Sequence, residues 1–182
     1  EHTISTSANS ARSVYAADVD GDGDMDVLSA SGDDDKIAWY EQEGSLVQTT
    51  YVPDDNFEQA LIDLGYDDVM DDYVLTANIS GVTGNLNVSS KSISDLTGIE
   101  GFTQLEVLNC SNNQLTSLDL SANTALTNIW CTSNQLTSLN VSGATSLTYL
   151  SCGANYLTSL DVSNNTALTY LDCNSMGNNS LT

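Results

Sequence analysis

Four cysteines recur at a fixed interval of 21 residues in the second half of the chain. Each ends a phrase of one form, LEVLNC, LTNIWC, LTYLSC and LTYLDC, and the four are Cys110, Cys131, Cys152 and Cys173. A constant period of this length is typical of a stack of small units, because one unit cannot bury its apolar edge without its neighbours. We therefore predict a solenoid, with function on the repeating outer surface rather than in a pocket.

The repeat consensus is LxxLxCxxNxL, which residues 105–115, 126–136 and 147–157 all match. This pattern closely resembles the leucine-rich repeat family, and the resemblance covers roughly residues 79–182. It implies a mainly β fold, a leucine-rich-repeat solenoid with 21-residue repeats that is truncated at its C-terminal end. Further apolar residues fill the other half of each repeat, at Leu118 and Leu120, Leu139 and Val141, and Leu160 and Val162. Since the short period leaves no room for a long helix, this side is predicted to be extended or turn-like.

The recurring cysteines and asparagines are interpreted as structural. Equivalent residues in stacked parallel strands lie about 4.8 Å apart, which suits a disulfide, but their Cβ atoms point in parallel directions instead of converging. We therefore expect buried free thiols that pack as small apolar groups, rather than two disulfides. Asn113, Asn134 and Asn155 are expected to hydrogen-bond the turn backbone of the adjoining coil, as such a column does in leucine-rich repeats.

Strand alternation predicts a candidate ligand-binding face. If Leu108 and Cys110 point into the core, the residues between such positions point outward. The outward set includes three aromatic residues with polar neighbours, and we select from it Asn128, Trp130, Tyr149, Ser151, Tyr170 and Asp172. Aromatic faces beside polar groups suit a sugar ring or a peptide. The alternative is that these aromatic residues only stabilise neighbouring strands.

Residues 1–48 are predicted to form a small β-meander around an acidic loop, because short alternating segments are separated by Gly and Asp. The loop places Asp at alternate positions, namely Asp18, Asp20, Asp22, Asp24 and Asp26. Oxygens at this spacing can surround Ca²⁺, which accepts six to eight oxygen ligands in flexible geometry. An EF-hand is excluded because no Glu occupies position 12 of the loop. The alternative is a solvated acidic turn.

The same segment resembles one FG-GAP or VCBS repeat, of the kind found in integrin-like β-propellers. The resemblance covers about residues 1–45 and rests on the loop pattern D-x-D-x-D-G-x-x-D. It implies Ca²⁺ as a structural brace, with the five aspartates as ligands. A single repeat cannot close a propeller, so either further repeats precede Glu1 or the meander docks against the following segment.

Residues 49–78 are predicted to form a helical cap on the N-terminal end of the solenoid. Asp54 or Asp55 can begin a helix of about ten residues, with Phe57, Leu61 and Leu64 on its apolar face. Gly65 supplies its C-terminal stop. Two nearby acidic clusters, Asp33–Asp35 and the group Asp67, Asp68, Asp71 and Asp72, are interpreted as solvated loops, the alternative being a second cation site.

Charge and residue content exclude several classes of function. The chain has 3 Lys+Arg against 25 Asp+Glu, a net charge of −22, and 19 of the carboxylates lie in residues 1–75. Nucleic acids and anionic membrane surfaces are therefore not expected as partners. Insertion into a membrane is not expected either, because no apolar run approaches about 18 residues. We also expect no enzyme activity, since the one histidine is His2 and no cysteine has a histidine partner.

These observations predict a secreted or bacterial cell-surface module for recognition or adhesion, stabilised by Ca²⁺, which binds an extracellular protein or glycan. The segment VPDDNFEQALIDLGYDD followed by cysteine-bearing repeats resembles surface proteins of Bacteroidetes-type bacteria and, in layout, internalin-like adhesins. Two alternatives stay open. The chain could be the non-catalytic region of a large secreted polysaccharide-degrading or proteolytic enzyme. It could also be a structural unit of an extracellular fibre, self-associating through the solenoid ends.

Overall fold

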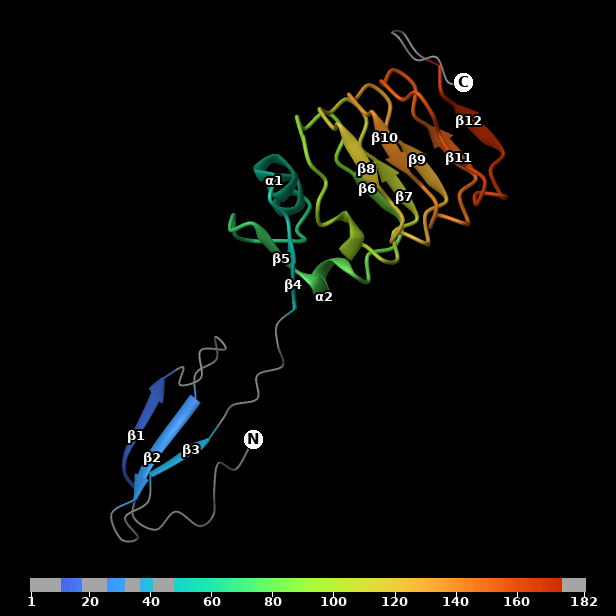
Figure 1. Ribbon diagram of the computed structural model, residues 1–182. Coiled ribbons are helices and arrows are strands. Elements are labelled where there is room, and N and C mark those ends of the chain that lie inside the picture. Colours follow the sequence, from blue (N-terminus) through green and yellow to red (C-terminus); the bar gives the residue numbers. More distant parts are fainter. Residues whose placement is uncertain (1–10, 18–25, 32–36, 41–47, 175–182) are drawn as a thin grey trace. The chain divides into compact units, whose positions relative to one another are not determined.

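The computed structural model of the protein describes residues 11–17, 26–31, 37–40 and 48–174, which fall into two compact units, Glu1–Val47 and Gln48–Thr182. The first unit contains three antiparallel strands in the order β1-β2-β3, with bounds Ala11–Ala17, Asp26–Ser31 and Ile37–Tyr40. These are the three strands of the predicted meander (Figure 1).

The second unit is dominated by a solenoid of parallel coils (Figure 1). One side is a five-stranded parallel sheet in the order β6-β7-β9-β11-β12, formed by Asn85–Asn87, Val107–Asn109, Asn128–Trp130, Tyr149–Ser151 and Tyr170–Asp172. The opposite side carries the parallel pair β8 (Ser117–Asp119) and β10 (Ser138–Asn140). Both the leucine-rich-repeat solenoid and the extended form of its second side are thus confirmed.

In β6, β7, β9 and β11 the middle residue of the short strand lies in the core, whereas Leu171 in β12, the last strand of the described sheet, is 42% exposed. Leu108 pairs with Ile129, and Ile129 pairs with Leu150, so the register advances by one repeat from strand to strand. All three side chains are fully buried. A slip of one residue would turn these side chains to solvent, so burial holds the register. The 21-residue period therefore sets the register of the sheet, because each strand residue pairs with the residue 21 positions further along the chain.

The cysteine column lies in this core. Cys110, Cys131 and Cys152 are buried, Cys173 is half-buried, and all four are free thiols. Burial raises the pKa of Cys110 and of Cys152 to about 12, and it raises that of Cys131 well above its ordinary value. The three buried thiols thus stay protonated at neutral pH and pack as apolar side chains.

The asparagine column connects successive coils by hydrogen bonds to the backbone, as predicted. Asn134 Nδ2 donates to the carbonyl oxygen of Cys131 in its own coil at 3.1 Å and to that of Cys110 in the preceding coil at 3.0 Å. Its Oδ1 accepts from the amide of Leu115 at 3.1 Å. Asn113 and Asn155 make equivalent contacts. The column therefore satisfies backbone groups that the turns leave buried.

A small α/β cap precedes the first coil (Figure 1). It contains β4 (Thr49–Tyr51), α1 (Asp55–Asp63), β5 (Tyr73–Leu75) and α2 (Thr76–Ile79), and β4 pairs antiparallel with β5. A short 3-10 helix, η1 (Ile99–Gly101), follows before β7. The cap helix was predicted from the sequence, whereas β4, β5 and α2 were not, because elements of three or four residues are too short to show a hydrophobic period.

Helix α1 begins and ends as predicted, but its apolar face differs at one position. Asp54 is the N-cap, Phe57 and Leu61 are fully buried, and Gly65 has a positive φ of 79°. Leu64, predicted to lie on the apolar face, is 46% exposed. It is the C-cap residue, where the helix ends and the chain turns away through Gly65.

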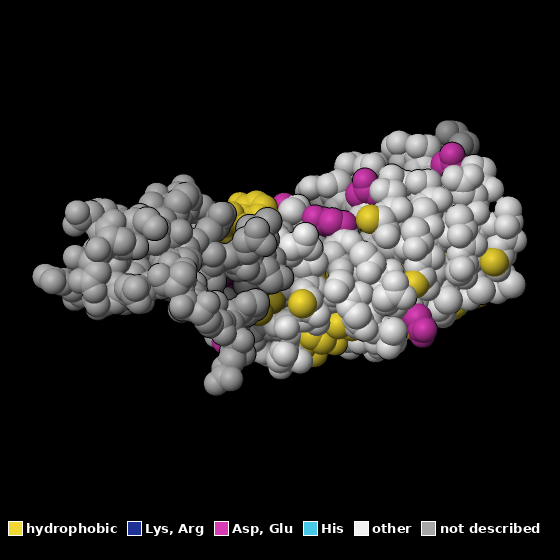
Figure 2. Space-filling view, turned by 90° about the horizontal axis from the view of Figure 1, so that it is seen from below, with side chains coloured by type: hydrophobic (Ala, Val, Ile, Leu, Met, Phe, Trp, Pro, Cys, Tyr) yellow, Lys and Arg dark blue, Asp and Glu magenta, His cyan; other side chains and the backbone are white. Residues whose placement is uncertain are grey.

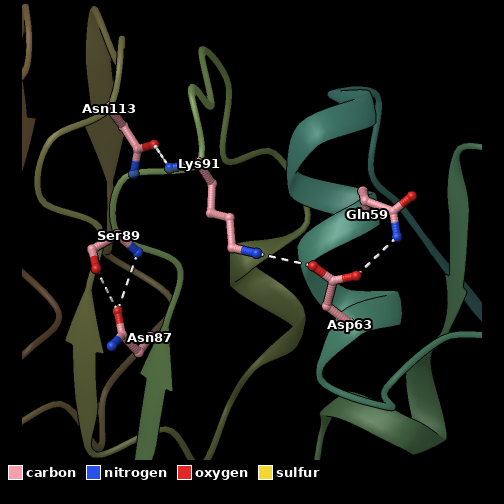
Figure 3. A network of polar contacts seen from close by, with 6 residues as sticks. All are labelled: Gln59, Asp63, Asn87, Ser89, Lys91 and Asn113. Carbon is pink, nitrogen blue, oxygen red and sulfur yellow. Dashed lines mark hydrogen bonds and ion pairs between the residues drawn. The ribbon is translucent and has the colours of Figure 1, made fainter.

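The cap is joined to the first coil by packing and by polar contacts. Tyr66 packs edge-on against Phe102, with ring centroids 5.9 Å apart. At Gly98, where φ is 104°, an added Cβ would lie 2.9 Å from the carbonyl oxygen of Tyr51, so only glycine allows this close approach. The last turn of α1 also reaches the coil through an ion pair between Lys91 Nζ and Asp63 Oδ2 at 2.9 Å (Figure 3).

Candidate ligand-binding face

The outer surface of the five-stranded sheet carries the predicted site. In β6, β7, β9, β11 and β12 the first and third residues point away from the core, and we call this surface the β-face. Asp172 is the one charged side chain among these outward positions. Much of the solenoid surface seen in Figure 2 is likewise uncharged, with isolated acidic and hydrophobic side chains.

Three aromatic side chains of the β-face form one continuous stack. Tyr149 and Tyr170 pair directly across β11 and β12, and their rings are parallel within 4°, with centroids 4.4 Å apart. Trp130 pairs in register with Ser151, so it meets Tyr149 diagonally, with centroids 5.0 Å apart and a tilt of 38°. The ring of Tyr149 therefore lies between the other two. We call these three residues the aromatic stack.

The stacking changes what the aromatic residues offer to a ligand. Trp130 and Tyr149 are half-buried because neighbouring rings cover part of their surface, while Tyr170 is 47% exposed. Tyr149 lies between its two neighbours, so it presents mainly its ring edge and hydroxyl group, whereas Tyr170, on the last strand of the described sheet, has a ring partner on one side only among the described residues. The Tyr149 phenol, and then the Asp172 carboxylate, raise the pKa of Tyr170, which keeps its hydroxyl neutral.

The polar neighbours of the stack differ in accessibility. Asp172 Oδ1 accepts from the backbone and side-chain amides of Asn174 at 3.0 and 2.9 Å, and its Oδ2 accepts from Ser151 Oγ at 3.2 Å. Ser151 was selected as a ligand contact, but its side chain is only 5% exposed and offers little surface to a ligand. Its hydroxyl instead orients the carboxylate of Asp172. Asn128 is half-buried and accepts from Thr127 Oγ1 at 2.8 Å.

The predicted calcium ligands Asp18, Asp20, Asp22 and Asp24 lie outside the described residues. Asp26 is the first residue of β2 and pairs with Ala17, the last residue of β1. Within the parts of the chain that the structure describes, no group of three or more His, Cys, Asp or Glu side chains is placed to hold a metal ion. Among the described helices, none combines the length and apolar character needed to cross a bilayer.

One buried carboxylate, Glu58, and one half-buried carboxylate, Asp67, were not recognised in the sequence. Glu58 on α1 is fully buried, and Asp67, interpreted as part of a solvated loop, has one side-chain oxygen shielded from solvent. No sequence signal marks Glu58, because a Glu in the first turn of a helix is favoured by the helix dipole wherever it points. Its position follows only from the packing of the loop Tyr66–Asp72.

Comparison with known proteins agrees with this fold. The family model described as leucine-rich repeats in two copies matches residues 103–143. Among solved structures, the chain is similar to the functional domain of InlJ from Listeria monocytogenes, with 43% identity and a TM-score of 0.63 over 72% of this chain and 29% of that one. That domain includes a cysteine ladder. In the present chain, Cys110, Cys131 and Cys152 form a column of buried free thiols.

A second similar structure is an internalin, InlF, from Listeria monocytogenes. It shares 24% identity and a TM-score of 0.52 over 66% of this chain and 43% of its own length, which is a likeness of fold. The chain thus spans less than half the length of either solved structure. Comparison with curated proteins gives no match. The described solenoid is therefore a leucine-rich-repeat fold similar to that of Listeria internalins.

Proposed function

We propose that this protein is a non-catalytic recognition module of an extracellular or bacterial cell-surface protein, and that it binds a protein partner through the aromatic stack of the β-face. The observation that carries the proposal is the stack itself, beside Asp172 on a face with no other charge. Likeness to internalin solenoids supports recognition as its role.

The geometry of the stack favours a protein over a glycan. A sugar ring binds flat against an open aromatic face, but both faces of Tyr149 are occupied by Trp130 and Tyr170. Along the stack, ring edges and phenol hydroxyls are available beside the outer face of Tyr170, and Tyr and Trp contribute these groups at protein interfaces. Asp172, held by Ser151 and Asn174, offers a preorganised acceptor to a donor on the partner.

Replacing Trp130 and Tyr149 together by alanine is expected to weaken binding at least about 30-fold, because even one aromatic anchor at an interface centre contributes about 2 kcal/mol. Binding would be measured for wild type and variant on protein and glycan arrays, and the dissociation constant of each hit by surface plasmon resonance. Tyr156→Ala is the matched control, since Tyr156 is 53% exposed and is not a residue of the five β-face strands.

Equal binding by the wild type and the double variant would exclude the β-face as the site and leave the stack a purely structural role. Hits confined to glycans would overturn the choice of a protein partner. The melting temperature of each variant is recorded as well, so that a loss of binding is not confused with a loss of folding.

The fibre alternative receives less support. End-to-end stacking of solenoids requires two open ends, whereas the cap is hydrogen-bonded to and packed against the first coil. Addition at that end would have to displace Phe57 and Leu61, which are fully buried. A recognition module needs no such displacement, because its surface is already exposed.

We also propose that the loop from Asp18 to Asp26 binds Ca²⁺ through the five aspartates and braces the β1–β2 hairpin. In support, Ala17 pairs with Asp26, so the two ends of the loop lie side by side and the carboxylates are confined to one short connection. Removing calcium with a chelator is expected to lower the melting temperature of the first unit. The double variant Asp20→Asn, Asp22→Asn is expected to show no such response to the chelator. A wild-type melting curve indifferent to chelator would refute the loop as a calcium site.

A further inference from the structure

The β-face carries hydrogen-bond donors in one column across three neighbouring strands. Asn87, Asn109 and Trp130 are the third residues of β6, β7 and β9, and the register pairs each with the next. Asn87 Oδ1 accepts from the amide of Ser89, and Asn109 Oδ1 accepts from the amide of Ser111, both at 3.1 Å. A backbone amide can donate only to the side-chain oxygen, so these contacts leave both Nδ2 groups as donors for other partners. We call Asn87, Asn109 and Trp130 the donor column.

The nitrogens of the donor column are available to a ligand. Asn87 Nδ2, Asn109 Nδ2 and Trp130 Nε1 have no hydrogen-bond partner among the described residues. Asn87 is exposed, and in the half-buried Asn109 and Trp130 neither nitrogen is shielded from solvent. An indole N–H, like the amide Nδ2, donates and does not accept. A ligand on this column must therefore supply hydrogen-bond acceptors.

The conformation of a polypeptide ligand decides which acceptors it can supply. The carbonyls of a helix are used within the helix, apart from those of its last turn. An extended strand offers carbonyls, but it also brings amide N–H groups that would find no acceptor in the donor column. A polyproline II segment has no internal hydrogen bonds, and its prolines have carbonyls without N–H groups. A proline-rich segment thus fits a surface that only donates.

The spacing of the coils matches the same conformation. Neighbouring strands lie about 4.8 Å apart, which places every second coil about 9.6 Å away. A polyproline II helix completes a turn of three residues in about 9.3 Å, so one side of it would meet every second coil. An extended strand repeats each side after about 6.7 Å, which matches neither one coil nor two. Asn87, Trp130 and Asp172 lie at intervals of two coils in one line of the register.

The two ends of this line beyond the amides offer an aromatic surface and a charge. Trp130 belongs to the donor column and to the aromatic stack, where the Tyr149 ring lies 5.0 Å from it, and aromatic side chains are the usual contact surface for proline rings. Two coils further, Asp172 is the one charged group of the β-face. Lys91, the one Lys or Arg in residues 48–174, is paired with Asp63. Asp172 is therefore open to a basic side chain of the ligand.

We propose that the element recognised by the β-face is a proline-rich segment in the polyproline II conformation, which lies along the solenoid and crosses β6 to β12. Its backbone carbonyls accept from the donor column, its prolines pack on the aromatic stack, and a basic residue pairs with Asp172. The inference rests on the proposed function, because it uses the same face, and it names the part of the protein partner that binds there.

The test measures binding of fluorescein-labelled peptides to the full chain by fluorescence anisotropy. Two probes carry about nine prolines, enough to cross all five strands, with one arginine at the N-terminal or the C-terminal end to allow for either chain direction. Reference peptides keep the arginine and replace proline by glycine and serine. We expect one proline probe to bind at least about tenfold more tightly than its reference, because a preformed polyproline II helix loses less conformational freedom on binding.

Two substitutions separate the parts of the site. Asn109→Asp keeps the oxygen that accepts from Ser111, as Asp172 does with Asn174, but replaces the donor by a carboxylate oxygen. It is expected to weaken binding of the proline probe at least about tenfold. Asp172→Asn is expected to weaken the arginine-bearing probe about threefold or more, and to leave a proline peptide without arginine no weaker. Tyr156→Ala, outside the β-face strands, is expected to change neither.

Several results would overturn the inference. They are equal affinity for the proline and the reference peptides, and binding of the proline probe that survives Asn109→Asp or the double substitution of Trp130 and Tyr149. If neither proline probe binds at about 1 mM while that double variant loses protein partners on the arrays, the β-face stays the proposed site and the proline-rich ligand is refuted. If binding on the arrays is also indifferent to the aromatic stack, both proposals are refuted.

Discussion

Replacing Asn134 by alanine is expected to lower the free energy of unfolding by about 3–5 kcal/mol, because several buried backbone groups lose their hydrogen-bond partner at once. Asn134 is 7% exposed and bridges two coils through the carbonyls of Cys110 and Cys131 and the amide of Leu115. Alanine leaves these backbone groups buried without their partner, at about 1–3 kcal/mol each before relaxation. Because every repeat contacts only its neighbours, a break at this junction weakens the whole stack.

Urea-induced unfolding of wild type and variant measures this loss. Gln135→Ala is the control, since Gln135 is the exposed neighbour and its substitution is expected to change stability by no more than about 0.5 kcal/mol. Asn134→Asp preserves the shape but puts a carboxylate oxygen against two carbonyl oxygens, and we expect it to be at least as harmful. A loss below about 1 kcal/mol for Asn134→Ala would mean that the asparagine column is not a principal source of stability.

Asp54→Ala is expected to cost about 2–4 kcal/mol and to loosen the cap from the first coil. Asp54 Oδ1 accepts from the amides of Asn56 and Phe57 at 3.0 and 3.1 Å, which makes it the N-cap of α1. Its Oδ2 accepts from the amide and hydroxyl of Ser94 at 2.8 and 2.6 Å and from the amide of Asp95 at 3.0 Å. Loss of an N-cap costs about 0.5–2 kcal/mol, and hydrogen bonds to a charged group contribute about 1.5–3 kcal/mol.

The contribution of Asp54 is also expected to depend on pH. Burial opposes its ionisation, but the hydrogen bonds from Ser94, Phe57 and Asp95 outweigh burial and hold the pKa below the ordinary 3.8. A lowered pKa in the folded state means that the stabilisation is present above the unfolded-state pKa and is lost as pH falls through the folded-state value. The difference in stability between wild type and Asp54→Ala should therefore shrink below about pH 3.8. A difference that stays constant down to pH 2 would contradict this explanation.

The ion pair at the other end of α1 provides the matched comparison. Lys91 and Asp63 have side chains 42% and 49% exposed, and Gln59 Nε2 also donates to Asp63, at 3.1 Å (Figure 3). Surface pairs of this kind contribute about 0–1 kcal/mol, so Asp63→Asn should have a small effect that added salt reduces further. The contacts of Asp54 and of Asp63 join the same helix to the same coil. The Asp54 contact is more buried, and we therefore expect it to contribute more to the free energy of unfolding.

Much of the solenoid was predictable because its information is local and repeated. The inward positions of Leu108, Cys110 and Asn113 follow from one repeat unit, and each later repeat restates them. The cap occurs once, and its strands are three residues long, so neither periodicity nor repetition marks β4 and β5. The prediction that Leu64 lies on the apolar face was wrong for a related reason. Helical spacing places Leu64 on that face, but the helix ends one residue earlier, at Asp63.

By itself, the sequence determined the stack of coils, the core columns and the outward direction of Trp130, Tyr149 and Tyr170, because the 21-residue period and the alternation of a strand act over short distances along the chain. Only the tertiary structure decided that these three rings form one stack and that Ser151 is buried beside them. It also decided that Glu58 lies buried, with one oxygen that has no hydrogen-bond partner among the described residues. These features depend on which distant segments touch, and that is set by the packing of the whole unit rather than by any local pattern.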